Sequence, residues 1–126
     1  MKKIVADNAP KAIGPYAHAI QSGNLVFCSG QTPLNPTTML IEGATVTEQT
    51  TLVLNNLESV LRAAGSDRSM VLKTSVFLKN FADFEKMNKA YEAFFGDHKP
   101  ARTTVEVSRL PREALVEIEC VGEVKV

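Results

Sequence analysis

Apolar and polar residues alternate in several short stretches of the chain, which is the pattern of half-buried β-strands. Near the start, AHAIQ (17–21) and LVFCSG (25–30) flank the turn signal SGN (22–24). Two such stretches joined by a short turn are typical of a β-hairpin. We therefore predict a hairpin here, followed by an irregular loop that contains Pro33, Asn35 and Pro36.

Three further strands are predicted in the middle and at the end of the chain. VLKTSVFLK (71–79) places Leu72, Thr74, Val76 and Leu78 on one side and Lys73, Ser75, Phe77 and Lys79 on the other. PARTTVEV (100–107) and ALVEIECVGEVKV (114–126) are joined by SRLPRE (108–113). We expect these last two strands to form a final pair.

Two helices are predicted from apolar residues at helical spacing and from their start and stop signals. The first begins with the capping box of Thr45 and Glu48 and ends at Gly65. Its apolar residues are Val53, Leu57, Val60, Leu61 and Ala64. The second begins near Asn80 or Asp83, ends at Gly96, and places Phe84, Met87, Tyr91, Phe94 and Phe95 on one stripe.

The order of these elements predicts an α+β fold in a single domain, residues 1–126, with a mixed sheet of about six strands. Two helices of this length cover only one face of such a sheet. The other face still carries apolar residues such as Phe77. We therefore expect a homo-oligomer in which copies of the chain cover that face through symmetric interfaces.

Charge and cysteine content disfavour several classes of protein, without excluding a nucleic-acid role. The chain has 14 Lys and Arg against 14 Asp and Glu, so no net field attracts nucleic acid or an anionic membrane. Cys28 and Cys120 lie among apolar neighbours and are interpreted as buried reduced thiols. The first ten residues contain no apolar run that would form a secretion signal or a membrane span. We expect a cytoplasmic protein without nucleic-acid or membrane partners.

The strand 100–107 raises the question of why Arg102 lies in a half-buried strand. If it pairs as a hairpin with the last strand, Arg102 and Thr104 share a sheet face with Glu117 and Glu119. One interpretation is a solvated cross-strand charge pair. The other is the floor of a site, because an arginine removed from water needs a carboxylate or an anionic ligand.

Other chemical groups give weaker signals. His18 and His98 have no partner at metal-ligand spacing, so we predict no metal site. Ser29 and Gly30 directly end a strand, where a hydroxyl and backbone amides are available to a ligand or simply to a turn. Asn88 borders the apolar stripe of the second helix. Asparagine has a low helix propensity, so its presence there indicates that its side chain has a polar function. No phosphate loop, dinucleotide fingerprint or hydrolase motif is present, so no cofactor is predicted.

Several motifs together resemble the Rid family of reactive intermediate deaminases, also called the YjgF family. They are IGPYAHAI, LVFCSGQTPLNP, AAGS at the end of the first helix, VLKTSVFLKNFADFEKMNKAYEAFFG, and PARTTVEVSRLP followed by VEIECVG. The similarity spans nearly the whole chain. It implies a chorismate-mutase-like α+β fold and a homotrimer with ligand clefts at the subunit interfaces.

The resemblance to the RidA branch also implies an activity, the hydrolysis of 2-imino acids and their enamines. Examples are 2-aminoacrylate with 2-iminopropanoate, and 2-iminobutanoate, which give 2-oxo acids and ammonia. Arg102 matches the arginine that binds the substrate carboxylate, and its planar fork suits that task. Glu117 matches the glutamate that holds a water, and Tyr16 matches a tyrosine contributed by a neighbouring subunit.

The resemblance places Ser29, Gly30, Asn88 and Thr104 in the substrate cleft as well. Thr104 departs from the family pattern, because the position often carries cysteine. Threonine in place of cysteine has no effect if the family uses the backbone carbonyl of this residue. If the family uses the thiol, the activity is weakened. The sequence does not rank imine side chains, because loops 31–44 and 96–100 have no predictable conformation.

Two other functions remain as alternatives to the deaminase. One is a trimeric regulatory module that binds 2-oxo acids in the same cleft without turnover. The other is the ribonuclease or translation-inhibitor activity attached to some family relatives. The neutral charge and the lack of a basic stripe make the second the least supported.

Overall fold

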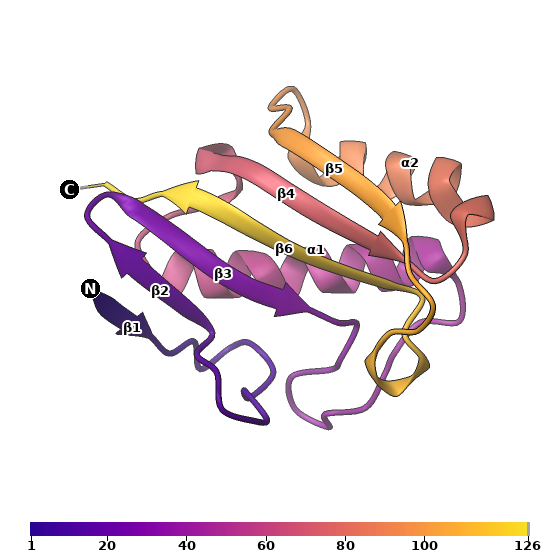
Figure 1. Ribbon diagram of the computed structural model, residues 1–126, viewed down its shortest axis with the longest axis horizontal. Coiled ribbons are helices and arrows are strands. Elements are labelled where there is room, and N and C mark those ends of the chain that lie inside the picture. Colours follow the sequence, from indigo (N-terminus) through magenta and orange to yellow (C-terminus); the bar gives the residue numbers. More distant parts are fainter. Residues whose placement is uncertain (126) are drawn as a thin grey trace.

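A computed structural model describes residues 1–125 and confirms an α+β fold with a six-stranded mixed sheet. The strand order is β1-β2-β3-β6-β4-β5. The strands are β1 (Lys2–Ile4), β2 (Ala19–Ser22), β3 (Leu25–Gln31), β4 (Val71–Leu78), β5 (Ala101–Glu106) and β6 (Val116–Glu123). Both helices, α1 (Val46–Ala63) and α2 (Phe84–Phe95), lie behind the sheet in Figure 1, so they cover one face only.

The helix boundaries agree with the signals in the sequence. The backbone N–H of Glu48 donates to the Thr45 hydroxyl at 3.2 Å, as expected of the capping box at the start of α1. The glycine after α1, Gly65, adopts a positive φ of 84°. At the start of α2 a short 3₁₀ turn, Phe81–Asp83, precedes the regular helix, and Gly96 ends it.

The core fills the space between the sheet and the two helices. Most of its fully buried side chains come from α1 and from alternate residues of the central strands, and α2 contributes Met87. The largest are Val26, Val53, Leu54, Leu57, Val60, Leu61, Val71, Val76, Leu78, Met87, Val116 and Ile118. Both thiols, Cys28 and Cys120, are buried and free, and they lie directly opposite each other on β3 and β6.

The predicted pairing of the last two strands is wrong. Strand β5 runs parallel to β4 at the edge of the sheet, and β6 lies between β3 and β4 with antiparallel neighbours on both sides. The burial pattern gives the reason. Val116, Ile118 and Cys120 of β6 are all buried and need cover from two neighbours, whereas no residue of β5 is buried.

Three smaller differences concern strand boundaries and register. The pairing of β4 with β6 shifts between Val71 and Lys73, so Val71 is fully buried while Leu72 is 43% exposed. The inward position predicted for Leu72 is therefore wrong, because a bulge moves it outward. Ser29 and Gly30 lie at the end of β3 as predicted, but the strand continues one residue further, to Gln31. The sequence analysis also missed the edge strand β1, which has only three residues.

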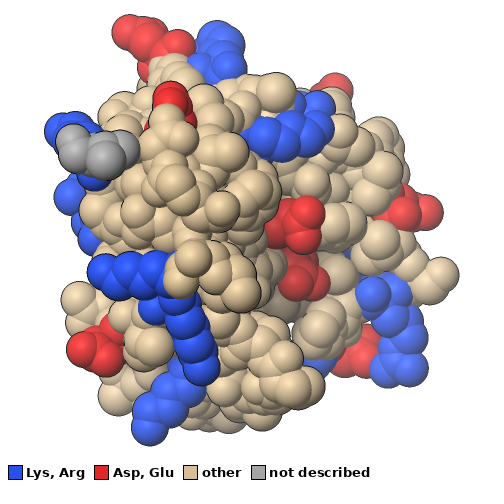
Figure 2. Space-filling view, turned by 60° about the vertical axis from the view of Figure 1, so that its left-hand side comes forward, with Lys and Arg blue, Asp and Glu red and all other residues tan. Residues whose placement is uncertain are grey.

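The face of the sheet that faces the viewer in Figure 1 carries no helix. Phe27 of β3 is 47% exposed and Val105 of β5 is 41% exposed, so apolar side chains remain open to solvent in the single chain. On the side shown in Figure 2, basic side chains gather along the left-hand and lower-left part of the molecule, while acidic side chains lie mostly in the centre and at the upper and right-hand edges. None of the helices in residues 1–125 combines the length and apolar character needed to cross a membrane.

Candidate active site

Arg102 lies over an aromatic wall on the helix-covered side of the sheet. Its guanidinium carbon is 4.8 Å from the centre of the Tyr91 ring and 5.7 Å from that of Phe84. Cation–π contacts of this kind orient a guanidinium without neutralising it. Within residues 1–125 no carboxylate lies within ion-pair distance of Arg102. The aromatic rings therefore orient the Arg102 guanidinium, and its positive charge is available to bind an anion.

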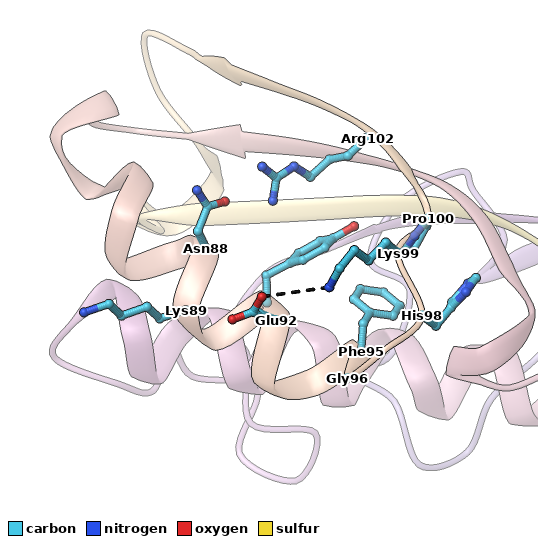
Figure 3. Close-up of a pocket in the computed structure, with 10 residues that line it drawn as sticks. Asn88, Lys89, Glu92, Phe95, Gly96, His98, Lys99, Pro100 and Arg102 are labelled. Carbon is cyan, nitrogen blue, oxygen red and sulfur yellow. Dashed lines mark ion pairs between the residues drawn. The ribbon is translucent and has the colours of Figure 1, made fainter.

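A cavity of about 540 Å³ opens beside Arg102, between α2 and the start of β5. Its lining residues are Asn88, Lys89, Tyr91, Glu92, Phe95, Gly96, His98, Lys99, Pro100 and Arg102. In Figure 3 the guanidinium of Arg102 reaches across the cavity toward Asn88, and Lys99 points toward Glu92. Burial raises the pKa of Tyr91, whose hydroxyl is bonded to that of Thr74 at 2.7 Å.

Two buried oxygens near Arg102 lack a hydrogen-bond partner among the described residues. They are Oδ1 of Asn88 and Oγ1 of Thr104, which shares a face of β5 with Arg102. Buried polar atoms are almost always bonded, so each unpaired one calls for an explanation. A polar ligand or water in this cleft would supply the missing donors.

Glu117 occupies a second cavity, of about 520 Å³, on the open side of the sheet. The lining residues are Lys11, Ile13, Tyr16, Ser29, Gly30, Thr32, Leu34, Pro111, Arg112, Glu117 and Glu119. Burial, and to a lesser degree the negative charge of Glu119, raises the pKa of Glu117. No hydrogen bond or ion pair from residues 1–125 stabilises its carboxylate. A half-buried carboxylate of this kind is a candidate base.

Gly30 makes room for the Glu117 carboxylate. A Cβ on residue 30 would lie 3.0 Å from Cδ of Glu117 and closer still to Oε2. The neighbouring Ser29 is committed to the scaffold, since its hydroxyl donates to the carbonyl of Ala17 at 2.7 Å. The register of β3 against β6 is irregular between Cys28 and Gln31, which is where Ser29 and Gly30 lie. This irregularity brings the β3 backbone close to Glu117.

Tyr16 lies at the edge of the Glu117 cavity of its own chain and is 49% exposed. The segment before β2 is fixed by the buried His18, whose Nδ1 accepts from the backbone N–H of Ala6 at 2.9 Å. The Nε2 of His18 lies 2.7 Å from the carbonyl of Pro10. Both ring nitrogens are therefore used in the structure, as expected for a structural histidine.

The structure separates the predicted site into two groups, and the expectation that Arg102 and Glu117 share a sheet face is wrong. Arg102 pairs with Thr74 of β4, and Glu117 pairs with Phe77 of the same strand. Residues three apart in a strand point to opposite faces. Asn88 lines the cavity of Arg102, and Thr104 shares the Arg102 face of β5 without lining that cavity. Tyr16, Ser29 and Gly30 line the cavity of Glu117.

Sequence reasoning missed the additional cations that line these cavities. Lys99 lies in the Arg102 cavity, and Lys11 and Arg112 lie in the Glu117 cavity. Lys11 and Lys99 come from loops and Arg112 comes from a short 3₁₀ turn, where periodicity carries no signal. Lys89 of α2 also lines the Arg102 cavity. Within residues 1–125 no group of three or more His, Cys, Asp or Glu side chains is arranged for a metal ion.

Comparison with known proteins gives one consistent result. A sequence model of the family described as Endoribonuclease L-PSP matches residues 6–124. A RutC family protein of Pyrococcus horikoshii is 48% identical over 123 residues, covering 97% of this chain and 98% of that protein. The 2-iminobutanoate/2-iminopropanoate deaminase of Escherichia coli is 43% identical over 124 residues, covering 96% of each. The crystal structure of E. coli TdcF with bound serine has a TM-score of 0.94 at 38% identity, covering 99% of this chain and 100% of that one.

Proposed function

Because the chain belongs to the endoribonuclease L-PSP family, which includes the YjgF and RidA proteins, we propose that it is a 2-iminobutanoate/2-iminopropanoate deaminase. The carrying observation is a pair of opposite charges, Arg102 and Glu117, that each line a cavity without an ion-pair partner in residues 1–125. A 2-imino acid needs a cation for its carboxylate and a base for the attacking water.

The proposed active site forms where two subunits of a homotrimer meet. In one chain Arg102 and Glu117 lie on opposite faces of the sheet and do not act on one small molecule. If one subunit lays its Arg102 cavity beside the Glu117 cavity of the next, both groups face one cleft. The same contact would cover Phe27 and Val105, the exposed apolar residues of the open face.

Within this cleft each predicted residue has a physical task. Arg102 binds the substrate carboxylate with its planar fork, while Asn88 and Thr104 offer their unpaired oxygens to polar hydrogens of substrate or water. Gly30 leaves space beside Glu117, and Ser29 keeps β3 in place. The hydroxyl of Tyr16, which accepts a bond from Ile13 N at 3.3 Å, is available to a second partner at the cavity edge.

The reaction is the addition of one water followed by the loss of ammonia. Glu117 accepts a proton from a water as its oxygen attacks the imine carbon, and the C=N double bond becomes a C–N single bond. The proton taken by Glu117 passes to the imine nitrogen, which becomes the amine of a carbinolamine. The carbinol O–H then gives its proton, through Glu117, to this nitrogen as the C–N bond breaks, so that ammonia leaves and the carbonyl of the 2-oxo acid forms. The raised pKa of Glu117 makes this carboxylate a stronger base than an exposed one.

This chemistry requires neither a metal nor a coenzyme, because such imines already hydrolyse in water. The site needs only to neutralise the carboxylate and to position one water. We also place the protein in the cytoplasm. The buried, reduced Cys28 and Cys120 suit a reducing compartment.

A coupled assay tests the proposal. Threonine dehydratase releases 2-iminobutanoate, and excess protein should speed the decay of the imine absorbance. Arg102→Ala should lower this acceleration by at least about 100-fold, since a charge-assisted carboxylate contact is lost. Arg109→Ala, which removes an exposed arginine outside both cavities, is the matched control. Unchanged imine decay with the wild-type protein would reject the proposal.

A regulatory module that binds a 2-oxo acid without turnover is the second candidate. The bound serine of the related TdcF structure favours small-molecule binding in this fold. Saturable binding of 2-oxobutanoate without any acceleration of imine decay would support this alternative. Ribonuclease activity is the least supported function, because the 14 Lys and Arg are matched by 14 Asp and Glu and the chain has no net positive charge.

A further inference from the structure

Three non-glycine residues in residues 1–125 adopt a positive φ, and two of them are joined beside the Glu117 cavity. They are Met39 (61°), Arg112 (56°) and Glu113 (60°). Nη1 of Arg112 donates to the carbonyl of Met39 at 3.2 Å. Left-handed backbone is costly for residues with a side chain, and it concentrates at ligand clamps and active sites. The loop that contains Met39 and the turn that contains Arg112 together form one rim of the Glu117 cavity. This rim is therefore a candidate functional region.

Both loops of this rim are anchored to the protein body. In the first loop, Leu34 pairs with Ile41 in an isolated bridge, and the carbonyl of Leu34 accepts from the side chain of Asn56 at 2.9 Å. In the second, Ala114 is fully buried, and the N–H of Leu115 donates to Oε1 of Gln49 at 2.8 Å. These contacts fix the backbone on both sides of the rim, so the position of Arg112 is well defined.

The turn carries two arginines with different partners. Arg109 forms an ion pair with Glu113 at 2.7 Å and does not line either cavity. Arg112 lines the Glu117 cavity, and among residues 1–125 it has no carboxylate partner. Its one hydrogen bond, to Met39, leaves most of its N–H donors available. Arg109 is therefore neutralised by Glu113, whereas Arg112 is available to a ligand in the cavity.

The charges around the two cavities accommodate a second negative group. In the Glu117 cavity Lys11 and Arg112 balance Glu117 and Glu119. In the other cavity Lys89, Lys99 and Arg102 outnumber the single carboxylate of Glu92. If the two cavities join as proposed above, cations exceed carboxylates by two. A cleft with this surplus favours a dianion.

We propose that Arg112 is a specificity-determining residue that binds a second carboxylate at the side-chain end of the substrate, so that 2-imino dicarboxylic acids are preferred. This inference rests on the proposed deaminase function. Arg102 would hold the carboxylate next to the imine carbon, and Glu117 would hold the water. Arg112, on the same chain as Glu117, would reach the distal carboxylate with its planar fork.

The test compares one acidic and one neutral substrate. An aspartate oxidase generates 2-iminosuccinate, and threonine dehydratase generates 2-iminobutanoate. For Arg112→Met, the ratio of kcat/KM for the acidic imine to that for the neutral imine should fall about five- to tenfold, a modest effect because the site is exposed. The change should lie in KM. Arg112→Lys should restore part of the ratio, and Arg112→Glu should lower it further.

Arg109→Met is the matched control, because it removes a cation from the same turn outside the cavity. It should leave the ratio unchanged. The wild-type preference should also weaken as salt is raised, since exposed charges are screened. An unchanged ratio in Arg112→Met, or an equal change in Arg109→Met, overturns the inference while the deaminase function stands. If the wild-type protein hydrolyses neither imine, the proposed function fails together with the inference.

Discussion

Two carboxylates of this chain, Glu58 and Glu117, are withdrawn from water in opposite ways. Glu58 is 8% exposed and accepts hydrogen bonds from Arg62 and Arg68, with Arg62 Nη2 at 3.1 Å. Burial acts to raise the pKa of Glu58, but the bonds from the two arginines win and lower it overall. Glu117 has no such partner, and burial followed by Glu119 raises its pKa.

The arginines show the same difference. Arg68 and Arg102 both lie over an aromatic ring, at 3.9 Å from the centre of Phe94 and 4.8 Å from that of Tyr91. Arg68 is also bonded to Glu58 and to the carbonyl of Phe94, so it ties α1 to α2. Arg102 has no carboxylate partner in residues 1–125. The paired charges of Glu58, Arg62 and Arg68 therefore connect the two helices, whereas Arg102 and Glu117 each line a cavity without such a partner, as candidate functional groups do.

Replacing Glu117 is expected to give the largest effect. Glu117→Gln keeps the shape of the side chain but removes the base, so imine hydrolysis should fall by about 10²- to 10⁴-fold. The folded protein should be retained, because the carboxylate makes no hydrogen bond or ion pair in residues 1–125. The dehydratase-coupled assay measures the rate, and circular dichroism checks the fold. Activity within twofold of wild type would remove Glu117 from the mechanism.

The same substitution at Glu58, which is paired with Arg62 and Arg68, should reduce stability and leave activity unchanged. Glu58→Gln leaves Arg62 and Arg68 without their carboxylate and should reduce the free energy of unfolding by about 1–3 kcal/mol. The lower part of this range applies because the side chains of both arginines are partly exposed, at 66% and 41%. Urea denaturation measures the change. Activity at a temperature where the variant is folded should match wild type, and a large loss would contradict the distinction.

The elements of the fold were predictable because their signals are local. The capping box at Thr45 and Glu48 and the glycines after both helices act within a few residues of the boundaries that they set. The partner of β5 was not predictable in this way. Strands adjacent in sequence usually pair, and only the pairing of β6 with β3 along one edge and with β4 along the other shows that it belongs in the centre.

The residues of the candidate site stay a prediction from the resemblance, and their arrangement on the sheet was not predictable from the sequence. The resemblance singled out Arg102 and Glu117, yet alternation could not relate their faces without knowing that β4 lies between β5 and β6. Arg112 escaped notice for a different reason. Its role depends on a positive φ and on a contact with Met39, 73 residues away, and neither leaves a pattern in the sequence.

Gly30 tests whether the space beside Glu117 matters. Gly30→Ala places a methyl group against the Glu117 carboxylate and should lower activity about tenfold by displacing it, a loss equivalent to about 1.4 kcal/mol. The backbone φ of Gly30 is not positive, so the clash is the expected cause. The same clash should also lower the free energy of unfolding, measured by urea denaturation, and this loss should disappear in a Glu117→Ala background, where the clashing carboxylate is absent. An equal destabilisation in both backgrounds would show that the effect lies in the β3 backbone.

The smallest expected effect is a difference in the pH dependence of stability. Glu117 has a folded-state pKa above its ordinary value of 4.5, so ionisation costs stability as the pH rises through that raised pKa. Glu117→Gln should therefore match wild type below about pH 4 and become more stable above it, by under about 1 kcal/mol since the group is half-buried. Glu58 has a lowered pKa. The ionised Glu58 therefore adds to the free energy of unfolding above about pH 4.5, and this stabilisation is lost as the pH falls through its folded-state pKa. Unfolding free energies from pH 3 to 8 should then give stability differences of opposite sign for the two variants at neutral pH. If Glu117→Gln loses stability as the pH rises, the Glu117 carboxylate has a partner in solution and the contrast with Glu58 disappears.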